Sequence, residues 1–263
     1  MPPLIAVNEV SRAFGGAARI VQALDRVSFE IETGDFVSIV GASGCGKSTL
    51  LKIISGLLPP SSGEVFVNGA PVIEALENVG MVFQSPVLLK WRSVLGNVLL
   101  PVEFARRDVT AHLERARQLL CLVGLGGFEE MYPHQLSGGM QQRVSLCRAL
   151  VTDPELLLMD EPFGALDAMT RDELDAELLR IWEEKKKTVL FVTHSIQEAV
   201  FLSDYVLVMS ARPGRLVETI PIRLPRPRTV ELMSSAEFGE YTLKLRSLLA
   251  ASAGSSAMAG STG

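Results

Sequence analysis

The sequence contains no apolar run that approaches the roughly 18–20 residues needed to cross a bilayer as a helix. Its N-terminus also lacks a basic stretch followed by an apolar one, which is the pattern of a secretory leader. These two absences predict a soluble, intracellular chain. Any contact with a membrane is then expected to come through a partner.

Cysteine is scarce, and positive and negative charges nearly balance each other. Cys45, Cys121 and Cys147 lie far apart without CxxC spacing, which argues against zinc and against a disulfide framework. The net charge is −5 and the basic residues are scattered, so no basic footprint for nucleic acid is present. The densest basic run, residues 185–187, follows two glutamates and is interpreted as the solvated end of a helix.

The chain has 263 residues, of which 48% are hydrophobic, and this is enough to form a sizeable core. Alternating patterns at 4–10 and 19–32, and a strand at 64–69 that ends in an Asn-Gly turn, predict a small antiparallel sheet. Apolar strands alternate with helices elsewhere, which predicts a mainly parallel sheet covered on both sides. The strands are expected at 36–40, 155–160, 188–193 and 205–209, and the helices at 48–55 and 171–186.

The region from 86 to 135 differs, because prolines punctuate it and helical periodicity dominates 111–123. We interpret it as a helical subdomain inserted into an α/β core. The predicted organisation is one domain over 1–250, with core segments 1–85 and 151–222, a helical subdomain 86–150 and a C-terminal extension 223–250. Residues 251–263 are almost wholly Ala, Ser, Gly and Met, which predicts a disordered tail.

A glycine-rich loop of the form GxxxxGKS joins the strand at 36–40 to the helix at 48–55. Its glycines let backbone N–H groups point toward a phosphate, and the following helix adds its positive end. Lys47 is expected to reach the β- and γ-phosphates of a nucleotide and Ser48 to bind Mg²⁺. A glycine-rich turn without a ligand is the alternative, but the flanking strand and helix favour a phosphate site. The candidate binding residues are Gly41, Ala42, Ser43, Gly44, Cys45, Gly46, Lys47, Ser48 and Thr49.

Two acids, Asp160 and Glu161, follow an apolar run at 156–159. They are expected at the carboxyl edge of the sheet, where ligands bind. Asp160 would hold Mg²⁺, directly or through water, and Glu161 would act as general base on an attacking water. An N-cap pair before Pro162 is the alternative.

The segment Leu136-Ser137-Gly138-Gly139-Met140-Gln141 begins about 90 residues after Lys47 and opens a predicted helix at 140–150. The hydroxyl of Ser137 and the amides of Gly138 and Gly139 form a second anion site. A P-loop kinase would not explain this segment.

Together these segments resemble the ATPase subunit of an ATP-binding-cassette (ABC) transporter, over about residues 4–228. The resemblance implies a P-loop NTPase (RecA-like) α/β core with a mainly parallel sheet, a small antiparallel β subdomain and an inserted helical subdomain. It implies ATP and Mg²⁺ as ligands and hydrolysis coupled to transmembrane transport. It also implies that two ATPase subunits close as a dimer, with Ser137, Gly138 and Gly139 clamping the γ-phosphate that the second subunit holds.

Four further residues take their expected roles from this resemblance. Gln84 matches the glutamine that contacts Mg²⁺ and water, and His194 matches the switch histidine that contacts the γ-phosphate. Asp167 lies in the loop at 165–167 that communicates between subunits. Phe14 resembles the aromatic residue that stacks on adenine, with a core phenylalanine as the alternative. The residues assigned to catalysis are Lys47, Gln84, Glu161 and His194, and those assigned to the metal are Ser48, Gln84 and Asp160.

Segments 83–86, 88–92, 160–167 and 224–228 resemble the branch that imports nitrate, aliphatic sulfonates, taurine and pyrimidine precursors. Ala42 and Lys90 depart from it, since proline is common at both positions. The branch implies membrane permease subunits as partners, a separate extracytoplasmic protein that selects the solute, and no nucleic acid. The expected location is the cytoplasmic face of the cell membrane. A non-transport ABC ATPase of DNA repair or translation is the alternative, but such proteins usually carry tandem cassettes or basic surfaces.

The stretch from Ser85 to Leu100 is apolar for a loop-and-helix segment. Leu88, Leu89 and Trp91 lie before the helical pattern begins. They either belong to the core of the helical insert or lie on a surface where a permease helix docks.

Overall fold

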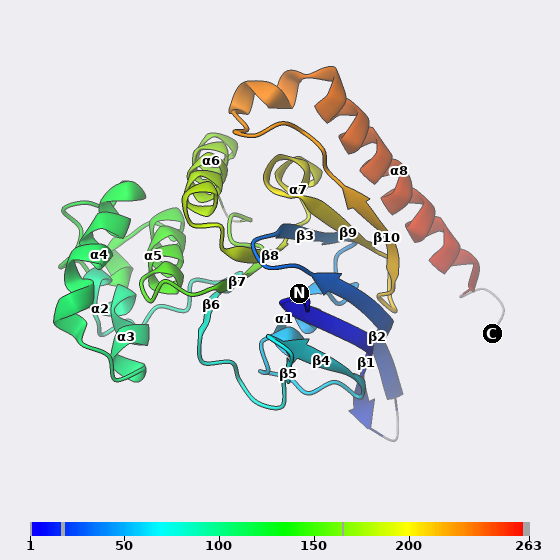
Figure 1. The fold of residues 1–263 in the computed structure, drawn as a ribbon, viewed down its shortest axis with the longest axis horizontal. Helices are drawn as coiled ribbons and strands as arrows, with labels where there is room; N and C mark the ends of the chain where they lie inside the picture. Colours follow the sequence, from blue (N-terminus) through cyan, green and yellow to red (C-terminus); the bar gives the residue numbers. More distant parts are fainter. Residues whose placement is uncertain (1, 17–18, 165, 260–263) are drawn as a thin grey trace. The chain divides into compact units, whose positions relative to one another are not determined.

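The computed structural model describes residues 2–16, 19–164 and 166–259 and divides the chain into two compact units (Figure 1). The first unit consists of Met1–Leu76 and Lys186–Gly263, and the second is Glu77–Lys185. The second unit is therefore an insertion in the first. It contains the predicted helical subdomain 86–150 together with two strands and a long helix.

A small antiparallel sheet forms one layer of the first unit, as the alternating sequence patterns predict. Its order is β2–β1–β4–β5, and Ile5 on the central strand lies opposite both Ile31 and Val67. The turn between β4 and β5 places Asn68 and Gly69 at positive φ, which is the requirement of a tight two-residue hairpin. The strands are β1 (Ile5–Gly16), β2 (Arg19–Ile31), β4 (Ser62–Val67) and β5 (Ala70–Pro71).

The first unit also holds four strands of the second sheet. β8, β3 and β9 run parallel, and β10 pairs antiparallel with β9. Every residue of β3 and β8 is buried, as expected for strands covered on both faces. The mainly parallel sheet is thus confirmed. The strands are β3 (Phe36–Gly41), β8 (Thr188–Val192), β9 (Tyr205–Met209) and β10 (Leu216–Pro221).

Three α-helices complete the first unit: α1 (Lys47–Ile54), α7 (Ile196–Leu202) and α8 (Ala236–Ala259), the last preceded by the short 3₁₀ helix η2 (Val230–Ser234). α7 packs against β3, and α8 lies along α7 and β9 (Figure 1). α8 includes residues 251–259, where composition predicts disorder. Alanine is the best helix former, and extending an existing helix costs far less than starting one. Residues 260–263 of the predicted tail lie outside the described residues.

The second unit is built around α5 (Gly138–Leu150), which contacts α2, α3, α4 and β6. A Cβ on Gly80 of β6 would lie 2.5 Å from the carbonyl oxygen of Ala149, so this helix approaches the strand closely. Its other elements are β6 (Val79–Val82), α2 (Val94–Val98), α3 (Leu100–Phe104), α4 (Val109–Leu122), η1 (Pro133–Gln135), β7 (Leu156–Asp160) and α6 (Ala168–Lys185), with β6 and β7 parallel. Within the described ranges, no helix is both long enough and apolar enough to span a membrane.

Candidate functional site

The glycine-rich loop leaves β3 at its carboxyl end and turns directly into α1. Gly44 and Gly46 have φ of 71° and 109°, in the left-handed region that favours glycine. A Cβ on Gly46 would also lie 2.7 Å from Cδ2 of Leu24 and 2.9 Å from the carbonyl oxygen of Ala23. The loop therefore needs glycine at Gly46 for its dihedral angle and for space.

Lys47 begins α1 and is only 6% exposed. Its Nζ donates to the carbonyl oxygens of Gly41, at 2.9 Å, and Ala42, at 3.1 Å. The loop thus wraps around a buried ammonium group beside the positive end of a helix. Phosphate oxygens are stronger partners for such a group than neutral carbonyls. Ser48 and Thr49 follow in the first turn of α1, half-buried, so the predicted loop joins the end of β3 to the start of α1, as the sequence motif requires.

The turn between β9 and β10 packs on this loop. This contact was not predicted from the sequence. Arg212 donates from Nε and Nη2 to the carbonyl oxygen of Gly44 at 3.1 and 3.0 Å. A Cβ on Gly214 would lie 2.1 Å from the carbonyl oxygen of Cys45. The Pro213-Gly214 pair predicts a turn, but nothing in it tells which segment the turn covers. Burial raises the pKa of the Cys45 thiol, so this side chain stays neutral inside the loop.

His194 follows β8, whose neighbour in the sheet is β3. The amide of Thr193 donates to the carbonyl oxygen of Ile39 at 3.2 Å, which keeps the end of β8 aligned with the strand that enters the glycine-rich loop. His194 is exposed, while Thr193 is buried and accepts a bond from the amide of Ser195 at 2.9 Å. The histidine and the loop therefore share the carboxyl edge of one parallel sheet, the edge where ligands bind.

Phe14 lies on β1 with 39% of its surface exposed, so it is not a core phenylalanine. The guanidinium of Arg12 lies 4.8 Å from the centre of its ring, in cation–π contact. The same guanidinium donates to the carbonyl oxygen of Pro59 at 2.8 Å. The ring is thus held by an anchored cation, and stacking on a base stays its predicted role.

In the second unit, β6 and β7 bring Gln84 to the two acids. Val82 lies opposite Met159, so both strands end at the same level. Gln84 Nε2 donates to Oε2 of Glu161 at 2.9 Å, and Asp160 is buried at the end of β7. Glu161 has a φ of 46°, in the left-handed region that is uncommon for a residue other than glycine.

Ser137, Gly139 and Asp167 come together around a hollow of about 240 Å³. Ser137 caps α5, its Oγ accepting from the amide of Met140 at 3.3 Å. A Cβ on Gly139 would lie 2.8 Å from Cδ2 of Leu166, so the two segments touch closely. The amide of Thr170 donates to Asp167 at 3.0 Å and lowers the pKa of that carboxyl, which stays ionised.

The same hollow is lined by Arg143, which no motif in the sequence singles out. Its Nη1 donates to the carbonyl oxygen of Val123 at 2.9 Å. One cation and one carboxylate therefore face the predicted second anion site. Gly138, also predicted for that site, is exposed at the start of α5.

The loop that carries Trp91 is held from two sides. Arg148 donates to the carbonyl oxygens of Pro86, at 2.8 Å, and Val87, at 2.9 Å. The fully buried amide of Asn97 bonds to the backbone of Leu89, Arg92 and Ser93. Trp91 is nevertheless 75% exposed, so the alternative that it belongs to the core of the helical insert does not hold. Leu88 and Leu89 are half-buried.

The side chains predicted to bind a metal carry oxygen atoms, which are the ligands that magnesium prefers. In the described part of the chain, no three His, Cys, Asp or Glu side chains converge as a metal site would require. Mg²⁺ usually takes only one or two protein carboxylates and completes its shell with water and substrate phosphates. The Ser48 hydroxyl of the first unit, and the Asp160 carboxylate and Gln84 amide oxygen of the second, are each hard oxygen donors, so each is of the type that Mg²⁺ prefers.

Comparison with known proteins agrees with the motifs. A family model described as ABC transporter matches residues 24–164. The chain is 48% identical over 253 residues to the taurine import ATP-binding protein TauB of Rhizobium johnstonii, covering 94% of this chain and 96% of that protein. It is 43% identical over 240 residues to the aliphatic sulfonates import ATP-binding protein SsuB of Bacillus cereus, covering 91% and 94%.

Solved structures show the same fold. A dimeric ATP-binding cassette in a post-hydrolysis state, bound to ADP and Pi, matches with a TM-score of 0.76 and 33% identity, over 84% of this chain and all of that one. The cbiO1 protein of Clostridium perfringens, part of the ABC transporter complex cbiONQ, matches with a TM-score of 0.74 and 26% identity, over 94% and 98%.

Proposed function

The chain belongs to the ABC transporter family and is an ATPase of that family, and from this premise we propose that it energises the uptake of a small solute through a membrane permease. The observation that carries the proposal is the glycine-rich loop closed around the buried Lys47. Such a cradle gives a nucleotide phosphate a better partner than the loop's own carbonyls. The protein would act at the cytoplasmic face of the membrane, held there by the permease.

The solute is proposed from the family branch. Relatives named for taurine and aliphatic sulfonate import support the class of nitrate, sulfonate, taurine or pyrimidine precursor. A separate extracytoplasmic binding protein would select among them, since the subunit itself binds ATP. A role in DNA repair or translation is disfavoured by the net charge of −5 and by the names of these relatives.

The chemistry of hydrolysis follows from the groups that the chain supplies. Lys47 and the loop amides hold the β- and γ-phosphates, while Phe14 stacks on adenine. Glu161 withdraws a proton from the attacking water, and its bond from Gln84 fixes the direction of the carboxylate. His194 contacts the γ-phosphate. Ser48, Asp160 and Gln84 would hold Mg²⁺, which when bound neutralises charge that develops on the phosphate.

A second copy of the chain completes the proposed site. Ser137, Gly138 and Gly139 would bind the γ-phosphate held by the partner subunit, because the capped start of α5 presents a hydroxyl and backbone amides. The hollow that Ser137 and Gly139 share with Arg143 and Asp167 supports this role. ATP would thus join two half-sites, and its hydrolysis would release them.

The exposed loop around Trp91 is proposed as the permease contact. Val87 is 62% exposed and has a φ of 45°, strained for a β-branched residue. The bonds from Arg148 and Asn97 hold this apolar surface in one shape, which lowers the entropy lost on binding. A short cytoplasmic helix of the permease fits such a surface.

The proposed nucleotide site is tested by the substitution Lys47→Ala. Loss of a charge-assisted partner of the phosphates costs about 1.5–3 kcal/mol, so ATP affinity should fall tenfold or more. The measurement is a titration with a fluorescent ATP analogue. Lys52→Ala is the matched control, because Lys52 is exposed on the same helix. Equal affinities for the two variants and the parent would show that this loop is not the site.

A further inference from the structure

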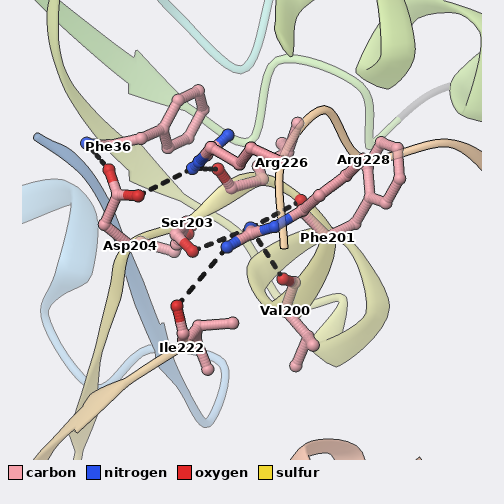
Figure 2. Close-up of polar contacts among 10 residues, drawn as sticks. Phe36, Val200, Phe201, Ser203, Asp204, Ile222, Arg226 and Arg228 are labelled. Atoms are coloured by element: carbon pink, nitrogen blue, oxygen red, sulfur yellow. Dashed lines mark hydrogen bonds and ion pairs between the residues drawn. The ribbon is translucent and has the colours of Figure 1, made fainter. Parts of the chain in front are cut away.

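The segment Arg226-Pro227-Arg228, named here the arginine strap, lies between β10 and η2. It belongs to segment 224–228, whose sequence resembles the importer branch. No step of the proposed hydrolysis uses it. Figure 2 shows both guanidinium groups directed at the last turn of α7 and at the residues that connect it to β9 (Tyr205–Met209). The strap therefore connects the C-terminal extension to elements that carry the site.

Arg228 is 5% exposed and is surrounded by backbone carbonyl groups. Its Nη1 donates to the carbonyl oxygens of Phe201 and Ser203, each at 2.8 Å, and of Val200 at 3.2 Å. Its Nη2 donates to the carbonyl oxygen of Ile222 at 3.4 Å. A single side chain thus joins the end of α7 to the chain that leaves β10 (Figure 2).

Arg226 completes the set. Its Nη2 donates to the carbonyl oxygen of Leu202 at 3.0 Å and to Oδ1 of Asp204 at 2.8 Å. The other carboxylate oxygen of Asp204 accepts from the amide of Phe36, at the start of β3, at 2.9 Å. The two arginines together reach the carbonyl oxygens of all four residues from 200 to 203.

These four carbonyls are the groups that a helix cannot satisfy by itself. The last carbonyls of an α-helix have no partner within the helix, and a cation near them also interacts favourably with the helix dipole. α7 has only seven residues, and helices of this length are not stable alone. The strap therefore fixes where α7 ends.

The other end of α7 controls the surroundings of His194. Ser195 caps the helix, accepting from the amide of Glu198 at 3.3 Å. Thr193 donates its hydroxyl proton to the carboxylate of the same Glu198. His194 thus lies between two residues that are both bonded to the first turn of α7. A helix of seven residues is only about 10 Å long, so a shift at one end moves the other.

We propose that Arg228 is a positioning residue for His194, acting through α7, and that Arg226 ties the same helix to the strand that leads into the phosphate loop. The proposal rests on the proposed function only in assigning His194 to the γ-phosphate. The structural claim is that the arginine strap determines where His194 lies. It can be tested without measuring ATP hydrolysis.

The test uses the full chain with Arg228→Met, Arg228→Lys and, as matched control, Arg223→Met, since Arg223 is exposed in the same tail. The chain has three histidines, and His112 and His134 belong to the second unit, so their ring signals serve as internal references in ¹H–¹³C NMR spectra. Arg228→Met should shift or broaden the His194 signal alone. Arg228→Lys should give an intermediate change, because an ammonium group lacks the planar fork that reaches several carbonyls.

Activity supplies the second readout, at a temperature well below unfolding. We expect kcat to fall about tenfold in Arg228→Met, with ATP affinity within twofold of the parent, because small misplacement of a catalytic group lowers the rate. The proposal is overturned if Arg228→Met only lowers the melting temperature while the His194 signal and kcat stay at parent values. Should that variant not fold, an Arg228→Lys protein with the parent spectrum and kcat overturns it equally. A parent that lacks ATPase activity would refute the proposed function, yet the NMR comparison would still decide the role of the strap.

Discussion

Individual residues set the chemistry of the site by where they place charge. The Lys47 ammonium group donates to loop carbonyls, and the Glu161 carboxylate accepts from Gln84. The left-handed backbone of Glu161 costs of order 1–3 kcal/mol, which the surrounding structure must offset. The sequence motif predicted the role of this glutamate. Its dihedral angle and its partner became visible only in the structure.

Asp35 gives a pH-dependent prediction. Burial, together with the nearby Asp204 and Glu32 charges, raises the pKa of its carboxyl above 3.8. The folded protein then binds the proton more tightly than the unfolded chain, so the contribution of Asp35 to stability falls as pH rises from about that value. Asp35→Asn should therefore raise the melting temperature at pH 7, and raise it less at pH 4.5.

Differential scanning calorimetry at the two pH values measures this effect. Glu30→Gln is a suitable control, since Glu30 is exposed on β2 and its substitution should change neither value. A gain from Asp35→Asn that is larger at pH 4.5 than at pH 7 would contradict the assigned direction.

Several residues could not be found from the sequence because their partners are backbone carbonyls far along the chain. Arg148 bonds to Val87 and Arg212 to Gly44, and no local pattern encodes such pairs. Asn97 resembles any polar residue on a short helix until its burial is known. The residues of the glycine-rich loop could be predicted because the spacing of its glycines, lysine and serine is typical of phosphate-binding loops.

Among the secondary-structure elements, the strands were the easiest to predict. β3, β7 and β8 are wholly buried and read as continuous apolar runs, which is typical of a parallel sheet. α2 and α3 have five residues each, too few to show a helical period. No helix was predicted where α8 lies, and disorder was expected from residue 251, since composition alone does not show that a helix already formed extends into the tail.

The loop between β6 and α2 carries the prediction about the permease. Trp91→Ala should leave folding and basal ATP hydrolysis of the isolated subunit largely intact, because the side chain is exposed. It should weaken co-purification with the permease and abolish transport, since an aromatic anchor often contributes more than about 2 kcal/mol to an interface.

The matched control is Phe104→Ala, because Phe104 is an aromatic residue of the same unit, 79% exposed at the end of α3 and outside this loop. It should leave permease binding unchanged. If both variants lose the permease equally, or if Trp91→Ala melts many degrees lower without a selective loss of binding, the docking site lies elsewhere.

At the scale of the whole molecule, the proposed ATP site requires two copies of the chain. The phosphate loop and the capped start of α5 are both proposed as anion sites, and the family resemblance assigns them to different nucleotides. The dimeric cassette bound to ADP and Pi, 33% identical to this chain, supports that assignment. An ATP molecule held by one subunit would be closed in by the other.

The most direct test of this claim is the molar mass of Glu161→Gln with ATP and Mg²⁺, measured by size-exclusion chromatography with light scattering. Losing general-base help typically slows hydrolysis by about 10²–10⁴-fold while the phosphate contacts remain, so ATP should persist and the mass should double. Adding Ser137→Arg to the same protein should leave ATP binding near normal but keep the chain monomeric, because the new cation fills the partner's phosphate pocket. A Glu161→Gln protein that stays monomeric at high concentration, or that hydrolyses ATP at the parent rate, would contradict the account.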